Sequence, residues 1–179
     1  IGADSNYSHY LYAHVDPDKY KRLTDYRIMA AYAEVADALD EICDDMINTD
    51  ENDVIAGIKF KAETSLSNTA QDEIQKEFQK LVTYFDLPNK GWDYFRQLLV
   101  EGEIYWEHII HKEHPDAGIL GILEVPGELI DPIYDNVQNL MIKGYLLRRP
   151  IMDPKTNQIE KFEYIPFDKN QITYTHSGV

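Results

Sequence analysis

The sequence predicts an α+β fold, with N-terminal amphipathic helices followed by antiparallel β-hairpins. In the first part of the chain, up to Gly102, apolar residues recur at helical spacings of three and four. Beyond Gly102 the segments become short and rich in aromatic and β-branched residues, and Gly or Pro turns separate them. Because helices come first and strands follow, the order favours α+β over a doubly wound sheet.

The N-terminal segment, residues 1–15, has neither helical nor strand periodicity and includes three tyrosines. We expect an arm, which is either a frayed terminus or a segment that orders against a neighbouring subunit. Asp16 followed by Pro17 predicts a helix start, since Asp caps N-termini and Pro suits the first helical position. The folded domain is therefore expected to cover residues 16–179.

Residues 16–48 have two apolar stripes about 170° apart on a helical wheel of about 100° per residue. The first stripe is Leu23, Tyr26, Ala30 and Ala33, and the second is Val35, Leu39, Ile42 and Met46. A straight helix would present two opposed apolar faces. We therefore expect two helices that meet near Tyr32–Glu34.

Acidic residues line the face opposite the second stripe. They are Glu34, Asp37, Asp40, Glu41, Asp44 and Asp45. Like charges four residues apart each cost about 0.2–0.5 kcal/mol, and no Lys or Arg within 34–46 relieves them. Three interpretations stay open: a solvated face held by tertiary packing, a face that meets a basic neighbour, or the lining of an aqueous path that DNA passes. Arg148 and Arg149 are a candidate basic counterpart.

Residues 55–63 alternate imperfectly between apolar and polar side chains, which predicts a strand. Ser67 or Thr69 can cap the next helix, with Asp72 and Glu73 in its first turn. The apolar stripe of that helix is Ile74, Phe78, Leu81, Val82 and Phe85.

The segment Leu87-Pro88-Asn89 is expected to end that helix, and Asn89 can cap a third one. Trp92, Phe95 and Leu99 share a face of the third helix, and Gly102 ends it or follows its cap.

The second half predicts two hairpins. Strands 104–110 and 119–125 flank a turn at 114–118, and Asp131-Pro132 marks another turn. The second hairpin pairs 144–149 with 159–165 around a turn at 153–157, and a further strand begins at 171–175.

His108, His111 and His114 are the only cluster that resembles a metal site. On a helix, a spacing of three would place the imidazoles on one face, as zinc requires. The surrounding residues predict a strand, however, where that spacing alternates faces, and the HExxH pattern is absent. A metal-dependent hydrolase using these histidines stays an alternative function, and histidines near a hairpin turn are favoured.

Cys43 is the only cysteine, so no disulfide can form within the chain and a reducing compartment fits. It is flanked by Asp44 and Asp45, whose charge raises a thiol pKa, and we interpret it as a small core residue instead of a nucleophile. No GxSxG, P-loop or GxGxxG motif occurs. We therefore assign no catalytic, cofactor-binding or metal-binding residue.

Composition excludes further classes. The formal net charge is −15, from 17 basic and 32 acidic residues, which argues against a domain that binds nucleic acid by neutralising phosphates. No run of about 18 apolar residues and no leader pattern is visible. Since the chain starts with Ile1 and ends in strand-like sequence, we expect it to be an excerpt of a longer protein.

Three segments together resemble the portal proteins of T4-like tailed bacteriophages. Residues 26–42, YRIMAAYAEVADALDEI, are similar to the family's YRxMAxYPEVxxALDEI segment. Residues 91–96 with 100–105 are similar to its GxDxFR and VxGxxY patterns, and residues 118–126 to its strand before an IDP turn. Ala33 stands where the family commonly has Pro, and Val125-Pro126-Gly127 replaces the IDP turn.

The resemblance implies a structural channel, not an enzyme. It implies the peripheral wing of a subunit in a ring, usually of twelve, at one capsid vertex, with stem, clip and crown beyond Val179. The implied partners are other copies, the major capsid protein, the terminase large subunit, neck proteins and double-stranded DNA that passes without sequence-specific contact. Such a ring is assembled in the host cytoplasm and belongs to the virion. A cytosolic adaptor domain is the remaining alternative.

Overall fold

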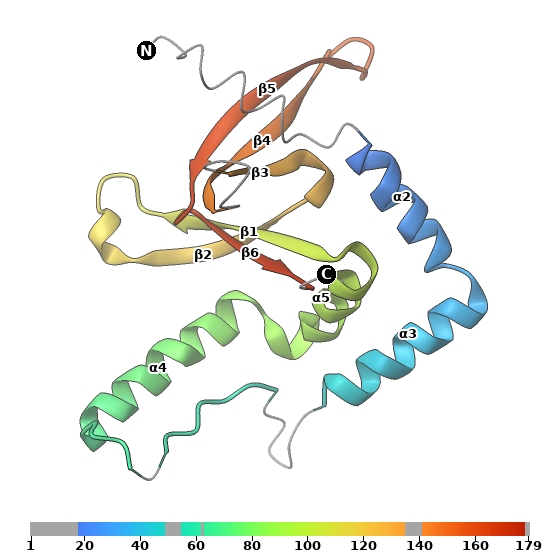
Figure 1. The fold of residues 1–179 in the computed structure, drawn as a ribbon. Coiled ribbons are helices and arrows are strands. Elements are labelled where there is room, and N and C mark those ends of the chain that lie inside the picture. The colour runs from blue at the N-terminus through green and yellow to red at the C-terminus, as the bar shows by residue number, and fades with distance from the viewer. Residues whose placement is uncertain (1–17, 49–54, 62, 135–140, 178–179) are drawn as a thin grey trace. The chain divides into compact units, whose positions relative to one another are not determined.

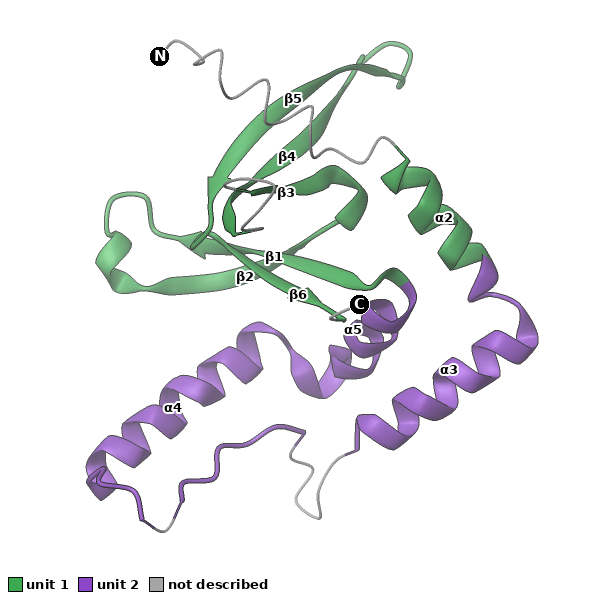
Figure 2. Ribbon diagram, in the orientation of Figure 1, with its two compact units in different colours: residues 1–28, 101–179 green, residues 29–100 purple. Residues whose placement is uncertain are grey.

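The computed structural model describes residues 18–48, 55–61, 63–134 and 141–177 (Figure 1). They divide into two compact units, of which unit 1 comprises residues 1–28 with 101–179 and unit 2 comprises residues 29–100 (Figure 2). Unit 2 is mainly helical, and unit 1 holds nearly all of helix α2 (Lys19–Met29), two short 3-10 helices and all the strands found in the described ranges. The predicted α+β class, with helices first and antiparallel strands afterwards, is confirmed.

The predicted break in the N-terminal helical segment is confirmed. Helix α2 (Lys19–Met29) ends before a short turn, and helix α3 (Ala33–Met46) begins after it. Tyr32 precedes α3 in an extended conformation, with φ −67° and ψ 135°. Its carbonyl accepts hydrogen bonds from the backbone N–H groups of Val35 and Ala36, so the first turn closes on Tyr32. The expected start at Asp16-Pro17 and the arm 1–15 lie outside the described residues.

Helix α4 (Asn68–Tyr84) begins with one of the two predicted caps. The Ser67 hydroxyl accepts a hydrogen bond from the Ala70 N–H at 3.2 Å. Because the cap is Ser67 and not Thr69, the prediction that Asp72 and Glu73 occupy the first turn is wrong.

Helix α5 (Leu87–Glu101) begins earlier than predicted. Asp86 has a left-handed backbone conformation, with a φ of 49°, and α5 starts at the next residue, Leu87. The predicted cap at Asn89 is therefore wrong, and its amide instead donates to the Asp86 carboxylate at 2.7 Å. The predicted end is confirmed, since Gly102 follows the helix with a φ of 78°, which favours glycine.

The strand predicted at 55–63 is wrong for the described residues 55–61 and 63, where the backbone forms neither strand nor helix. Burial still alternates there, with Ile58 and Phe60 half-buried and Lys59 and Lys61 exposed. The pattern thus gave the correct inward-facing residues. It could not supply a strand to pair with, and an extended segment needs one to form a sheet.

Unit 1 contains two three-stranded antiparallel sheets. The first has the order β2-β1-β6, with β1 (Glu103–Ile110) central between β2 (Ile119–Val125) and β6 (Ile172–His176). The second has the order β3-β4-β5, with β4 (Ile142–Met152) between β3 (Ile130–Tyr134) and β5 (Ile159–Asp168). Short 3-10 helices, η1 (Pro115–Ala117) and η2 (Gly127–Leu129), connect β1 to β2 and β2 to β3. Both predicted hairpins and the last strand are confirmed.

Asp131-Pro132 does not form the predicted turn, because both residues lie inside β3. Strand β3 is an edge of its sheet, where proline is tolerated since one side of the strand needs no backbone donor. Asp-Pro commonly marks a turn, but here it lies in a strand because β3 is at the edge of its sheet.

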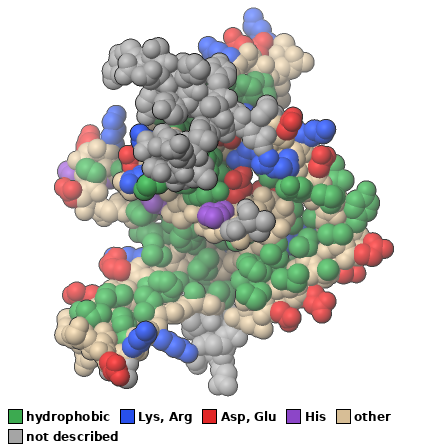
Figure 3. Space-filling view, viewed as in Figure 1, with side chains coloured by type: hydrophobic (Ala, Val, Ile, Leu, Met, Phe, Trp, Pro, Cys, Tyr) green, Lys and Arg blue, Asp and Glu red, His purple; other side chains and the backbone are tan. Residues whose placement is uncertain are grey.

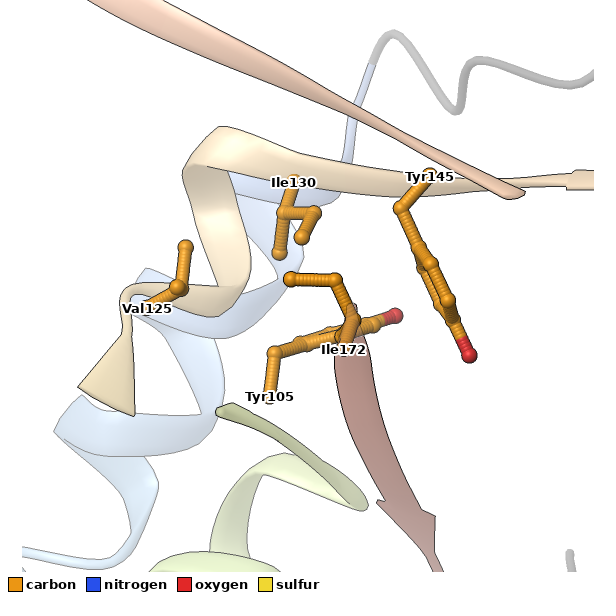
Figure 4. Packing of buried hydrophobic residues seen from close by; sticks show 5 residues of the cluster. All are labelled: Tyr105, Val125, Ile130, Tyr145 and Ile172. Atoms are coloured by element: carbon orange, nitrogen blue, oxygen red, sulfur yellow. The ribbon is translucent and has the colours of Figure 1, made fainter. Parts of the chain in front are cut away.

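Side chains of both sheets meet in one core, seen in Figure 4, made of Tyr105, Val125, Ile130, Tyr145 and Ile172. The Tyr105 ring stacks on Tyr174 at 4.8 Å and meets Tyr145 edge-on at 6.0 Å between centroids. Burial raises the pKa of Tyr174 to about 12, so its hydroxyl stays protonated at neutral pH. Aromatic residues predicted as strand formers therefore also join the two sheets.

Candidate interaction surfaces

The three histidines of the candidate metal site have other roles in unit 1. His108 Nδ1 lies 3.0 Å from the Asn170 carbonyl, an acceptor, so that nitrogen carries a proton, and Nε2 lies 2.7 Å from the Thr173 hydroxyl. His111 Nδ1 accepts the backbone N–H groups of Glu113 and His114. Within the described ranges, no group of three His, Cys, Asp or Glu side chains is placed to hold a metal ion. His108 and His111 stabilise the strand and the turn through these hydrogen bonds, the His114 ring lies 5.1 Å from the His111 ring, and the hydrolase alternative is not favoured.

Cys43 is completely buried on α3, in agreement with its interpretation as a core residue. Burial is the largest cause that raises the pKa of its thiol, and Asp40 and Asp44 act in the same direction. The positive charge of Arg96 acts in the opposite direction, but the net effect still raises the pKa of the thiol. A raised pKa leaves little thiolate at neutral pH, so the group is a weak nucleophile.

The acidic block of α3 divides into two sets, which the sequence did not separate. Asp40 binds Arg96 of α5 at 2.7 Å, and Asp44 accepts a hydrogen bond from the Trp92 indole N–H at 2.8 Å. Asp40 and Asp44 are four residues apart on α3, and Trp92 and Arg96 are four residues apart on α5, so the two contacts lie one helical turn apart. This ladder holds α3 against α5 inside unit 2. The matching spacing of Trp92 and Arg96 was the available sequence signal, and it was missed.

The other acidic residues of α3 are exposed. They are Glu34, Asp37, Glu41 and Asp45. The candidate counterparts Arg148 and Arg149 bind elsewhere, in unit 1: Arg148 contacts Asp131 at 3.3 Å and the Glu128 carbonyl at 2.8 Å, and Arg149 pairs with Glu163. Arg96 is thus a basic partner of the block among the described residues.

The predicted apolar stripe of α3 stays largely open to solvent. Val35, Ile42 and Met46, which we call the α3 ridge, are 42%, 46% and 64% exposed. The face that packs inside unit 2 is instead the neighbouring one with Cys43. Figure 3 shows hydrophobic side chains at the surface next to acidic ones. An exposed row of large apolar side chains is typical of a surface that contacts another protein.

A second uncovered surface lies at the far end of strands β4 and β5. The last residue of β4 that pairs with β3 is Leu147, so residues 148–152 pair only with residues 159–164 of β5. We call these two segments the hairpin arm, which extends past β3 in Figure 1. Four of its large apolar side chains are more than two-fifths exposed: Met152, Ile159, Phe162 and Tyr164.

Buried and half-buried charges fix α2 to the sheets of unit 1. Lys19 is 3% exposed and donates to the Ile130 carbonyl at 2.8 Å, and its ammonium lies 2.6 Å from Glu103 and 3.8 Å from Asp131. Arg27 binds Glu101 at 2.7 Å and both Glu128 oxygens at 3.2 and 3.0 Å. The hydrogen bond from Arg27 lowers the pKa of Glu128. Sequence periodicity gave no sign of this network, because its members are far apart along the chain.

None of the helices in the described ranges is both long and apolar enough to cross a lipid bilayer.

Comparison with known proteins gives a consistent result. A family model described as "Bacteriophage T4-like portal protein (Gp20)" matches residues 19–179. The portal protein of Vibrio phage KVP40 is 26% identical over 167 residues, which cover 86% of this chain and 32% of that protein. The portal protein of Salmonella phage ViI is 22% identical over 150 residues, covering 83% of this chain and 26% of that protein. The chain therefore spans about a third or less of the length of these relatives.

Proposed function

This chain belongs to the T4-like bacteriophage portal protein family, and from that premise we propose that it is part of a subunit of a capsid portal. Its role is structural: copies of the protein form a ring at one vertex of the capsid, through which the genome enters during packaging and leaves during ejection. The protein is accordingly a virion component, assembled in the host cytoplasm.

Within the subunit, residues 16–179 form part of the wing and residues 1–15 an N-terminal arm. The stem, clip and crown belong to other parts of the protein. The short span of this chain relative to the two portal proteins supports this assignment, because most of each relative has no counterpart in it.

The partners we propose are further copies of the subunit in a ring of about twelve, the major capsid protein, the terminase large subunit and the neck proteins. Double-stranded DNA passes without sequence-specific contact. The net charge of −15 supports a surface to which phosphates do not adhere.

The observation that best supports a role in assembly is the exposure of large apolar side chains in both units, on the α3 ridge and on the hairpin arm. Monomeric proteins rarely leave contiguous rows of such residues uncovered, and a subunit buries them against its neighbours.

The test is the assembly state of the protein expressed from its complete coding sequence. Analytical ultracentrifugation over a wide concentration range should show a large species, and negative-stain electron microscopy should show rings. A protein that stays monomeric at every concentration and never appears as a ring would refute the proposal.

A further inference from the structure

We infer that Arg27 is a latch: it holds together the two points at which the chain passes between the units, and so limits the rotation of unit 2 against unit 1. The latch itself does not depend on the proposed ring.

The chain passes between the two units at two places. One crossing lies between Ile28 and Met29, and the other lies between Val100 and Glu101. Figure 2 shows that each crossing falls in the last turn of a helix, α2 in one case and α5 in the other. Compact units that are joined by two single backbone segments rotate about those segments unless a further contact restrains them.

Each crossing is followed by backbone that is suited to a hinge. After the first crossing comes the turn at residues 30–32, before α3 begins at Ala33. After the second comes Gly102, which has a φ of 78° between α5 and β1. Glycine has no Cβ, so its backbone has more accessible conformations than that of other residues. Hinge motions are usually absorbed by a few such residues at the ends of elements.

Arg27 connects the two crossings directly. It lies next to Ile28, after which the chain leaves unit 1, and Glu101 is the residue at which the chain returns to unit 1. The Arg27 Nε donates to Glu101 Oε1 at 2.7 Å, and the two terminal nitrogens donate to the two oxygens of Glu128 at 3.2 and 3.0 Å. A planar guanidinium that binds two carboxylates through three donors fixes their positions more strictly than a single ion pair does.

Helix η2 brings the second carboxylate, Glu128, to this place. Its first residue, Gly127, lies against both chain segments, since a methyl group added there would be 3.7 Å from Leu23 of α2 and 3.8 Å from the Glu101 carboxylate. The side chains of Glu101 and Glu128 are only 7% and 20% exposed. Removal of Arg27 would leave these two carboxylates without the guanidinium between them, and their repulsion would separate the crossings.

The two charged contacts of α2 therefore have different roles. Lys19 is buried against the Ile130 carbonyl and Glu103, so it keeps α2 on the sheets whether the latch is closed or open. The Arg27 side chain is 41% exposed, so dissolved ions reach it and raised salt should weaken the latch.

A closed latch presents the two exposed apolar surfaces, the α3 ridge of unit 2 and the hairpin arm of unit 1, in one fixed arrangement. Surfaces that are already fixed lose less conformational freedom when they bind. An open latch should therefore raise the concentration at which copies assemble. This consequence, unlike the latch, rests on the proposed function.

The test measures distances in the complete protein by double electron–electron resonance. Spin labels enter through non-natural amino acids, and labelled copies are diluted with unlabelled ones. One pair, at Lys76 of α4 and Glu124 of β2, spans the units, and a second pair, at Lys21 of α2 and Glu124, lies within unit 1; all three positions are exposed. Arg27→Gln should broaden the distance distribution of the first pair and leave that of the second unchanged. Raised salt should broaden the first pair in the unmodified protein.

Two further substitutions serve as comparisons. Asp25→Asn is the matched control, because it removes an exposed charge from the same helix two residues from Arg27, and it should change neither pair. Arg27→Lys keeps the charge but loses the paired donors, so it should broaden the first pair less than Arg27→Gln does. It also supplies the measurement if Arg27→Gln does not fold.

A covalent link in place of the ion pairs gives a second, independent test. Arg27→Cys/Glu101→Cys joined by a short bismaleimide should restore the narrow distribution of the first pair and make it insensitive to salt. Before the link is added, the same variant should have the broad distribution. The natural Cys43 is buried, and the unmodified protein treated with the same reagent is the control.

The outcomes separate this inference from the proposed function. If the first pair has the same width in Arg27→Gln as in the unmodified protein, Arg27 is not a latch. If both pairs broaden, Arg27 only holds α2 on the sheets, and the inference is overturned as well, as it is if the covalent link restores nothing. The absence of rings in the unmodified protein would refute the proposed function and leave the result on the latch unaffected.

Discussion

Replacing Ala33 with proline should stabilise the protein, although proline usually breaks helices. Ala33 is the first residue of α3, where the backbone N–H has no acceptor within the helix, so proline removes no helical hydrogen bond. Proline also restricts the preceding residue to extended conformations, and Tyr32 already has φ −67° and ψ 135°. The native backbone therefore accepts Ala33→Pro without rearrangement.

The size of the effect follows from the unfolded chain. A proline that fits the native backbone stabilises by about 0.4–1 kcal/mol, because it reduces the conformational freedom lost on folding. For a chain of this length that corresponds to a rise of about 1–4 °C in Tm. The matched control is Ala38→Pro, at an exposed site inside the same helix, where proline costs about 3 kcal/mol or more.

The assay can report on the two units separately. The chain has two tryptophans, Trp92 in unit 2 and Trp106 in unit 1, so fluorotryptophan labelling gives one ¹⁹F NMR signal for each unit. During thermal unfolding, the Trp92 signal should persist to higher temperature in Ala33→Pro and to lower temperature in Ala38→Pro. If Ala33→Pro lowered the stability of unit 2, the conformation of Tyr32 and the helix boundary described above would be wrong.

Three further predictions concern single contacts. Lys19→Met should lower the free energy of unfolding of unit 1 by about 3 kcal/mol, measured by urea unfolding, because it leaves the half-buried Glu103 carboxylate without its cation. Ser67→Ala should cost about 1 kcal/mol in the same assay by removing the cap of α4. The contact between Arg27 and Glu128 should be complete above the usual glutamate pKa, about 4.3, and lost as the pH falls below it, since the pKa of folded Glu128 is lowered. The protection of the α2 amides, taken relative to their intrinsic exchange rates at each pH, should therefore fall as the pH drops below about 4.3.

Each of these predictions has a control on the same element. Lys21→Met changes an exposed lysine of α2 and should have an effect within about 0.5 kcal/mol. Thr69→Ala changes an exposed residue of the first turn of α4 that does not cap it. Arg27→Gln should remove most of the acid dependence of α2, because it removes the main cause of the lowered Glu128 pKa. Equal effects of a variant and its control would contradict the contact concerned.

Local patterns predicted most elements of this chain because the physical signal for each is local. The phase shift between two apolar stripes located the break before Ala33 without help from proline. Runs of β-branched and aromatic residues located five of the six strands in the described ranges. The predictions of strands and turns were wrong where a neighbouring segment, and not the local sequence, determines the structure. Within the part of the chain that the structure describes, no strand pairs with residues 55–61, and Asp131-Pro132 becomes part of a strand at a sheet edge.

The surfaces were harder to predict than the elements. Periodicity identified the Val35–Met46 stripe, but it could not tell that the ridge would stay exposed while the face with Cys43 packed inside unit 2. An apolar stripe shows only that a helix face avoids water. Whether its own chain or a second copy covers that face depends on the fold and the assembly, which periodicity does not contain.

Helices α2 and α3 differ in the kind of contact that holds them in the fold. Leu23 is the only apolar side chain of α2 that is buried, and the rest of its contact with unit 1 comes from Lys19 and Arg27. Apolar contacts tolerate sliding, whereas a lysine that meets one carbonyl and one carboxylate fixes a helix at a single position. The charged network of α2 therefore sets its register on the sheets. Among the residues that the structure describes, no such charged contact involves the α3 ridge, and its apolar side chains stay exposed.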